Sequence, residues 1–208
     1  MTQILSLAAL VAALTFWIRH AGHEAASWPA TLVKTASTAA LALGGLAAGA
    51  PLWVVLGLAL GSVGDFALAR RGKAAFLVGM AAFAAGHLAY AAGFATGAQG
   101  GIGPAALILW PLVVVLVAVA WLWLAPRAGC LCWPVRLYGA VIGAMVAASA
   151  LTGQSLFVTG ALVFMASDLI LGLRMFVLTA PSAQLFASRL LWPLYWGGQA
   201  LILAGTLA

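Results

Sequence analysis

Charge is scarce in this sequence. Asp, Glu, Lys and Arg together make up 6% of the 208 residues, and only three residues in the whole chain are acidic. Hydrophobic residues make up 66%, and the mean hydropathy is +1.17. Polar residues are too few to cover the surface of a water-soluble globule, so the composition excludes one and indicates a polytopic membrane protein.

Motifs that carry nucleophilic, nucleotide or zinc chemistry are also missing. The chain has no G-x-S-x-G turn and no glycine-rich strand-to-helix turn, and its 24 glycines are interpreted as helix-packing residues. The stretch HAGHE, with His20, His23 and Glu24, lacks the spacing of helical zinc hydrolases and is interpreted as an interfacial loop. We expect no cofactor and no metal, with two intramembrane aspartates plus His87 as the alternative metal-binding set.

Long apolar stretches are what the chain does contain. A transmembrane helix needs roughly 20 mostly apolar residues. The stretches lack the polar alternation that is typical of a membrane β-barrel. The first stretch has no basic leading region, so it is interpreted as a short membrane helix and not as a cleaved signal peptide. We predict an all-α, single transmembrane domain over 1–208, a bundle of about eight helices. The predicted spans are 3–18, 32–50, 52–69, 74–96, 103–125, 134–151, 155–173 and 190–207.

The basic residues all fall in or beside alternate connections between these spans. They are Arg19, Lys34, Arg70, Arg71, Lys73, Arg127, Arg136, Arg174 and Arg189. The positive-inside rule then puts both termini outside the cytoplasm of a multi-pass protein, which we expect in a bacterial inner membrane. The net charge of +6 reflects this topology and suits anionic lipid headgroups, so no nucleic acid is expected as a partner. Cys130 and Cys132 lie in a cytoplasmic connection, where free or acylated thiols are expected.

Two of the three acidic residues, Asp65 and Asp168, fall inside predicted spans, where a carboxylate is expensive to bury. Asp65 precedes Arg70 by five residues and Asp168 precedes Arg174 by six. At 1.5 Å per residue, both carboxylates lie about 7–9 Å inside the same interface. The surrounding segments GSVGDFALAR and FMASDLILGLR are similar in sequence, and their aspartates are 103 positions apart. This is consistent with a 4+4 pseudo-repeat, in which each half of the chain contributes four helices.

Six further polar residues in the spans are candidates for lining one cavity with the aspartates: Lys34, His87, Tyr90, Tyr138, Tyr195 and Gln199. His87 and Tyr90 share one face of a helix at i and i+3. For each residue the alternative is a hydrogen bond between helices, and for Lys34 it is an extended side chain that reaches the interface.

A pair of buried carboxylates near an interface suits acid–base chemistry on a lipid. It also suits a small proton-coupled transporter in which the aspartates carry protons. A non-catalytic scaffold would leave the cost of burying the aspartates without a purpose.

The stretches GSVGDFALA, GHLAY, GALVFMASDLILGLRMF and YWGGQALILAG, in this order, resemble the YhhN-like lysoplasmalogenase family of membrane proteins over nearly the whole chain. Members of this family usually have Lys-Pro early in the second helix, whereas in this chain Lys34 is followed by Thr35. The resemblance implies about eight helices and an ether hydrolase that cleaves the vinyl ether bond of a lysophospholipid substrate, the lysoplasmalogen. It also implies that Asp65 and Asp168 are the catalytic pair. Two carboxylates can divide the roles of acid and anion in such a hydrolysis, as they do in glycosidases.

The charge distribution yields a topology prediction. Cysteine labelling with a membrane-impermeant reagent should place 70–73 and 127–136 in the cytoplasm and both termini outside, because basic connections stay inside. A C-terminal tag that is labelled only from the cytoplasm would overturn the predicted arrangement.

Overall fold

Helices account for all the regular structure in the computed structural model, which describes residues 2–22, 27–98 and 103–208. The α-helices are α1 (Thr2–Arg19), α2 (Trp28–Ala47), α3 (Leu52–Leu68), α4 (Lys73–Thr96), α5 (Pro104–Val119), α6 (Cys132–Ser149), α7 (Ser155–Phe176) and α8 (Pro181–Leu207). A π-helical segment η1 (Ala120–Leu124) and a 3₁₀ segment η2 (Ala125–Leu131) join α5 to α6, and η3 (Ala150–Thr152) follows α6.

The predicted all-α class is confirmed for the described residues, and the chain is a multi-pass membrane protein. Within the part of the chain that the structure describes, five helical stretches are long and apolar enough to cross a membrane, and one of them, Ala106–Thr152, runs from α5 into η3. Helix α3 is apolar but shorter. The count of eight spans and the 4+4 repeat remain predictions.

Two helices begin earlier than the apolar stretches predicted. Helix α2 begins at Trp28, because Ser27 caps its first turn by accepting a hydrogen bond from the Ala30 amide at 3.3 Å. Helix α8 begins at Pro181, whose missing N–H costs nothing in a first turn. The nine added residues of α8, PSAQLFASR, mix polar and apolar side chains, so hydropathy did not detect them.

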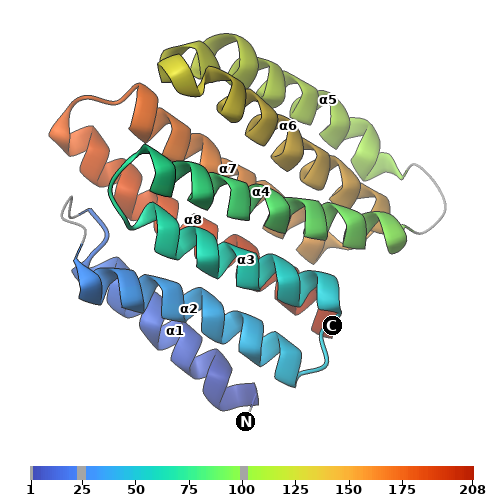
Figure 1. Cartoon of the computed structure of the whole chain (residues 1–208). Coiled ribbons are helices and arrows are strands. Elements are labelled where there is room, and N and C mark those ends of the chain that lie inside the picture. The colour runs from blue at the N-terminus through green and yellow to red at the C-terminus, as the bar shows by residue number, and fades with distance from the viewer. Residues whose placement is uncertain (1, 23–26, 99–102) are drawn as a thin grey trace.

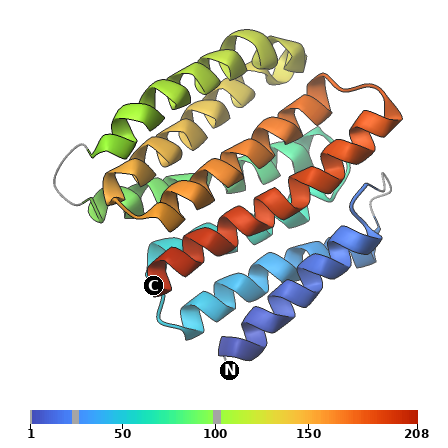
Figure 2. The same ribbon diagram turned by 180° about the vertical axis from the view of Figure 1, so that it is seen from behind.

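The helices are arranged as four antiparallel pairs (Figure 1). The α3–α4 and α7–α8 pairs lie face to face in the middle, as the two opposite views show, with α1–α2 on one side and α5–α6 on the other (Figure 2). The connections α3–α4, α5–α6 and α7–α8 lie at one end of the bundle, and both termini lie at the other. We call the end that contains these three connections the basic end, because the basic residues flank its connections.

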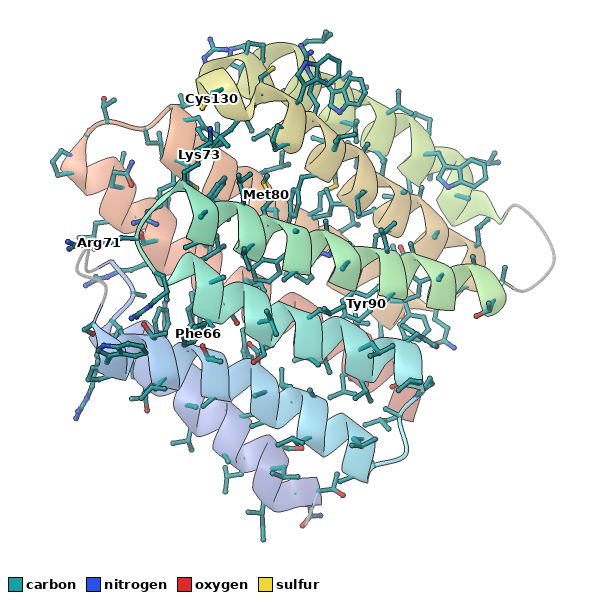
Figure 3. All side chains as sticks on the ribbon, viewed as in Figure 1. Phe66, Arg71, Lys73, Met80, Tyr90 and Cys130 are labelled. Carbon is teal, nitrogen blue, oxygen red and sulfur yellow. The ribbon has the colours of Figure 1, made fainter. Side chains whose placement is uncertain are left out.

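Tryptophans surround the basic end. The guanidinium groups of Arg70, Arg127 and Arg136 lie over the rings of Trp28, Trp123 and Trp133 at 4.3, 4.1 and 5.1 Å from the ring centroids. All three indoles are exposed. In Figure 3, Arg71, Lys73 and Cys130 also lie at this end, and Lys73 Nζ is 3.4 Å from Cys130 Sγ. Exposed indoles beside arginines are typical of a membrane–water interface.

Helices α7 and α8 bring their backbones into contact at two glycines. A Cβ atom at Gly198 would lie 2.9 Å from the carbonyl oxygen of Gly160 and 2.9 Å from the Phe164 amide nitrogen. A Cβ atom at Gly160 would in turn lie 2.9 Å from the Gly198 carbonyl oxygen. Only glycine permits backbones this close, a device that membrane helices use widely.

This contact predicts opposite effects for two neighbouring substitutions. Gly198→Ala should lower the thermal midpoint in detergent, because overpacking costs about 1–3 kcal/mol. Gly197→Ala, whose new methyl would meet no atom within 4 Å, should be neutral or stabilising because alanine favours helix. Equal midpoints for the two variants would contradict the α7–α8 contact.

Candidate active site

Asp65, on α3, has no exposed surface and is held by three side chains. Its Oδ1 lies 3.1 Å from Lys34 Nζ. Its Oδ2 accepts hydrogen bonds from Thr38 Oγ1 at 2.8 Å and from Tyr195 Oη at 2.7 Å. Lys34 and Thr38 are four residues apart on α2, so they face the same way, and Tyr195 comes from α8. The cluster thus connects α2, α3 and α8.

Lys34 points into the protein and does not extend freely to the interface. Its side chain is 16% exposed, and Nζ lies 5.7 Å from the centroid of the Trp192 ring. The Trp192 indole is itself held by donating to the Ala13 carbonyl oxygen at 3.0 Å. The pairing with Asp65 therefore decides between the two alternatives for Lys34.

Asp168, on α7, is the centre of a second cluster. Its Oδ2 accepts a hydrogen bond from Tyr138 Oη at 2.6 Å, and His87 Nε2 lies 3.2 Å from the same oxygen. His87 Nε2 also lies 3.1 Å from Tyr138 Oη, and His87 itself is completely buried. This cluster connects α4, α6 and α7. The Asp168 side chain is 12% exposed, against 1% for Asp65.

Both aspartates line a cavity of about 160 Å³ at the basic end, which we call the polar cavity. Its wall includes Gly22 after α1, Arg174 in the last turn of α7 and Ser188 in α8. The polar and ionisable side chains around it are His20, Lys34, Asp65, Asp168, Arg174, Ser188 and Tyr195. The cavity therefore combines two carboxylates with basic groups.

A second cavity, of about 70 Å³, lies between α4, α6 and α7, and we call it the apolar cavity. Met80 lines it from the side of α4 that faces α6 (Figure 3). Its only polar lining side chains are Tyr138 and Asp168. Asp168 therefore lies on the walls of both cavities.

Not all the residues predicted for the site come together. Of the eight, Lys34, Asp65, Asp168 and Tyr195 line the polar cavity, while His87 and Tyr138 join it through Asp168. Tyr90 and Gln199 instead form a separate buried pair, in which Tyr90 Oη donates to Gln199 Oε1 at 2.9 Å. For Tyr90 and Gln199, the interhelical hydrogen bond is the arrangement that the structure contains.

Sequence reasoning missed Thr38, Trp192 and Arg174. Helical spacing contains a signal for the first two, since Thr38 is one turn beyond Lys34 and Trp192 is one turn before Tyr195. Arg174 was considered only as a topology signal. Its position in the cavity wall depends on how α7 packs against α8 and on where α1 ends, which one sequence does not reveal.

The alternative metal site is not assembled. Within the described residues, no three His, Cys, Asp or Glu side chains are grouped so that they could hold a metal ion. Asp65 faces the Lys34 ammonium group instead of a second acidic or imidazole ligand. His23 and Glu24 of HAGHE lie outside the described residues.

Comparison with protein-family models identifies a family for this chain. A family model described as the YhhN family matches residues 29–206, which include every residue of both aspartate clusters. No curated protein and no solved structure matches the chain. The match confirms the resemblance found in the sequence.

The Lys34–Asp65 pair predicts a non-additive effect on stability. Lys34→Met should lower the free energy of unfolding in detergent by about 3–5 kcal/mol, because it leaves a buried carboxylate without its cation. Lys34→Met combined with Asp65→Asn should recover most of this loss. Lys73→Met, at an exposed lysine of the same end, is the control. Additive losses in the double variant would show that the two groups are not coupled.

Proposed function

The chain belongs to the YhhN family, and we propose that it is a membrane hydrolase that cleaves the vinyl ether bond of lysoplasmalogens. The observation that carries the proposal is that Asp65 and Asp168 line one cavity while each keeps its own set of hydrogen-bond donors. On the positive-inside reading this cavity opens toward the cytoplasmic leaflet, where lysolipid headgroups lie.

The reaction needs one acid and one anion. The acid protonates the alkenyl carbon that is remote from the oxygen, and the double bond becomes an oxocarbenium ion. Water adds to this cation and loses a proton, and the resulting hemiacetal collapses to a fatty aldehyde and a glycerophospho-base. The second carboxylate stabilises the cation and orients the water, as in glycoside hydrolysis.

The surroundings of the two aspartates favour a division of roles. Asp65 faces an ammonium group and accepts two hydroxyl hydrogen bonds, all of which stabilise the ionised form, so we assign it the anionic role. Among the described residues no lysine or arginine pairs with Asp168, and its contacts with His87 and Tyr138 both use Oδ2. Its Oδ1 can carry the proton, so we assign Asp168 as the acid, with His87 and Tyr138 holding it in place.

The proposal predicts that each aspartate is needed. Asp65→Asn and Asp168→Asn should each lower aldehyde release from a purified lysoplasmalogen mixture by about 10²–10⁴-fold, because each removes one of the two roles. A chelator should leave turnover unchanged. Thermal unfolding of each variant checks that the loss is chemical.

Three outcomes would contradict this function. Full activity in either variant removes that aspartate from the mechanism. Equal cleavage of ester, alkyl ether and vinyl ether lysolipids would indicate a different lipase. Proton-coupled solute flux in proteoliposomes without aldehyde release would favour the transporter, which uses the same aspartates.

A further inference from the structure

We propose that a bound lysolipid lies across Asp168, with its anionic headgroup beside Arg174 in the polar cavity and the first part of its chain in the apolar cavity. The substrate class rests on the proposed function. The position of the lipid's hydrocarbon chain and the recognition of its headgroup by Arg174 go beyond that function. Both rest on how the two cavities meet.

The two cavities are neighbours that share a wall. Asp168, Leu68, Phe83 and Leu171 line both of them. A molecule that occupies both cavities would therefore lie against this shared wall, in which Asp168 is the polar side chain. The bond at the junction of headgroup and chain would then lie beside the carboxylic acid.

The lining of each cavity matches one half of an amphiphile. Around the polar cavity Lys34 already faces Asp65, which leaves Arg174 as the permanently charged cation in its wall for a phosphate group. Arginine binds phosphate through paired N–H donors. The apolar cavity is walled by side chains such as Met80, Ile142 and Met165, which suit a hydrocarbon chain.

The apolar cavity leads outward to the lipid. At about 70 Å³ it holds only a short length of chain, and Met175 in its wall is 44% exposed. The remainder of the chain would continue into the bilayer. Entry from the membrane would then require no extraction of the whole lipid into water.

A competing surface exists between α5 and α6. This groove, of about 530 Å³, is lined by residues that include Val114, Leu122, Ala140 and Ala144. It is larger than the apolar cavity, but neither aspartate lines it. It therefore serves as the internal control for nonspecific lipid contact.

Photocrosslinking tests the position without turnover. The probe is an ester-linked lysophosphatidylcholine with a diazirine near the glycerol end of its chain, added to the purified protein in detergent. Mass spectrometry should find adducts around the apolar cavity, at residues such as Met80 and Met175. Adducts confined to the α5–α6 groove, or no adducts at all, would overturn the proposal.

A matched pair of variants tests whether the apolar cavity binds the hydrocarbon chain of the lipid. Gly139 lines the apolar cavity, and a new Cβ atom there would meet nothing closer than 3.8 Å. We expect Gly139→Leu to place its side chain in this cavity, and thermal unfolding checks that the variant folds. We expect it to lower the crosslink yield and to raise KM for a long-chain lysoplasmalogen about tenfold, the scale of one misplaced methylene. Ala140→Leu, one residue away but in the α5–α6 groove, should change neither value. Equal effects of the two would overturn the chain position.

A second pair tests the headgroup. Arg174→Gln should raise KM for a lysoplasmalogen about tenfold, with kcat nearly unchanged, because it removes a charged hydrogen bond to phosphate. Its KM for a phosphate-free alkenylglycerol should not change. Arg189→Gln, at an exposed arginine of α8, should affect neither substrate. An equal rise for both substrates would refute phosphate recognition by Arg174.

The two proposals can fail separately. Crosslinks in the apolar cavity without any aldehyde release would refute vinyl ether hydrolysis and keep the binding position. Aldehyde release with crosslinks only in the α5–α6 groove would refute the position and keep the reaction.

Discussion

The ion pair between Lys34 and Asp65 is the constraint on which the rest of the site depends. An ionised carboxylate with no exposed surface costs several kcal/mol in desolvation, and that cost is offset only when its partners are already in place. Those partners come from α2 and α8, while Asp65 itself is on α3. Three helices must therefore be packed correctly before the carboxylate is stable.

The second carboxylate imposes the same requirement on α4, α6 and α7, and aromatic rings pack between a partner of each carboxylate. The rings of Phe83 and Phe164 lie edge-on to the Tyr195 ring at 5.5 and 5.3 Å, and Phe164 also packs edge-on against His87 at 4.6 Å. These rings lie between partners of Asp65 and partners of Asp168. Each carboxyl thus keeps its own donors, which allows the two to hold different protonation states over one cavity.

Sequence reasoning found the helices and the aspartates but not the pairing of partners. Hydropathy located the apolar stretches because bilayer thickness imposes their length. It failed at the start of α8, where nine residues of mixed polarity precede the apolar run. Both aspartates were identifiable because a charge inside an apolar run is rare. Which tyrosine bonds to which aspartate depends on helix packing, so a single sequence could not separate Tyr138 and Tyr195 from Tyr90.

The position of Tyr90 bears on the choice between hydrolase and transporter. Moving from the basic end along α4, the polar cavity gives way to tightly packed rings. Trp53 lies edge-on to Tyr90 at 6.3 Å and to Phe94 at 5.4 Å, and Phe94 lies 5.0 Å from Phe157. Tyr90 and Phe94 are almost completely buried.

A transporter would have to open this layer in every cycle to expose the aspartates to the other side of the membrane. A hydrolase needs no opening there, because neither the polar cavity nor the apolar cavity is lined by these rings. The packing of the half of the bundle away from the basic end therefore favours chemistry at a one-sided cavity over alternating access.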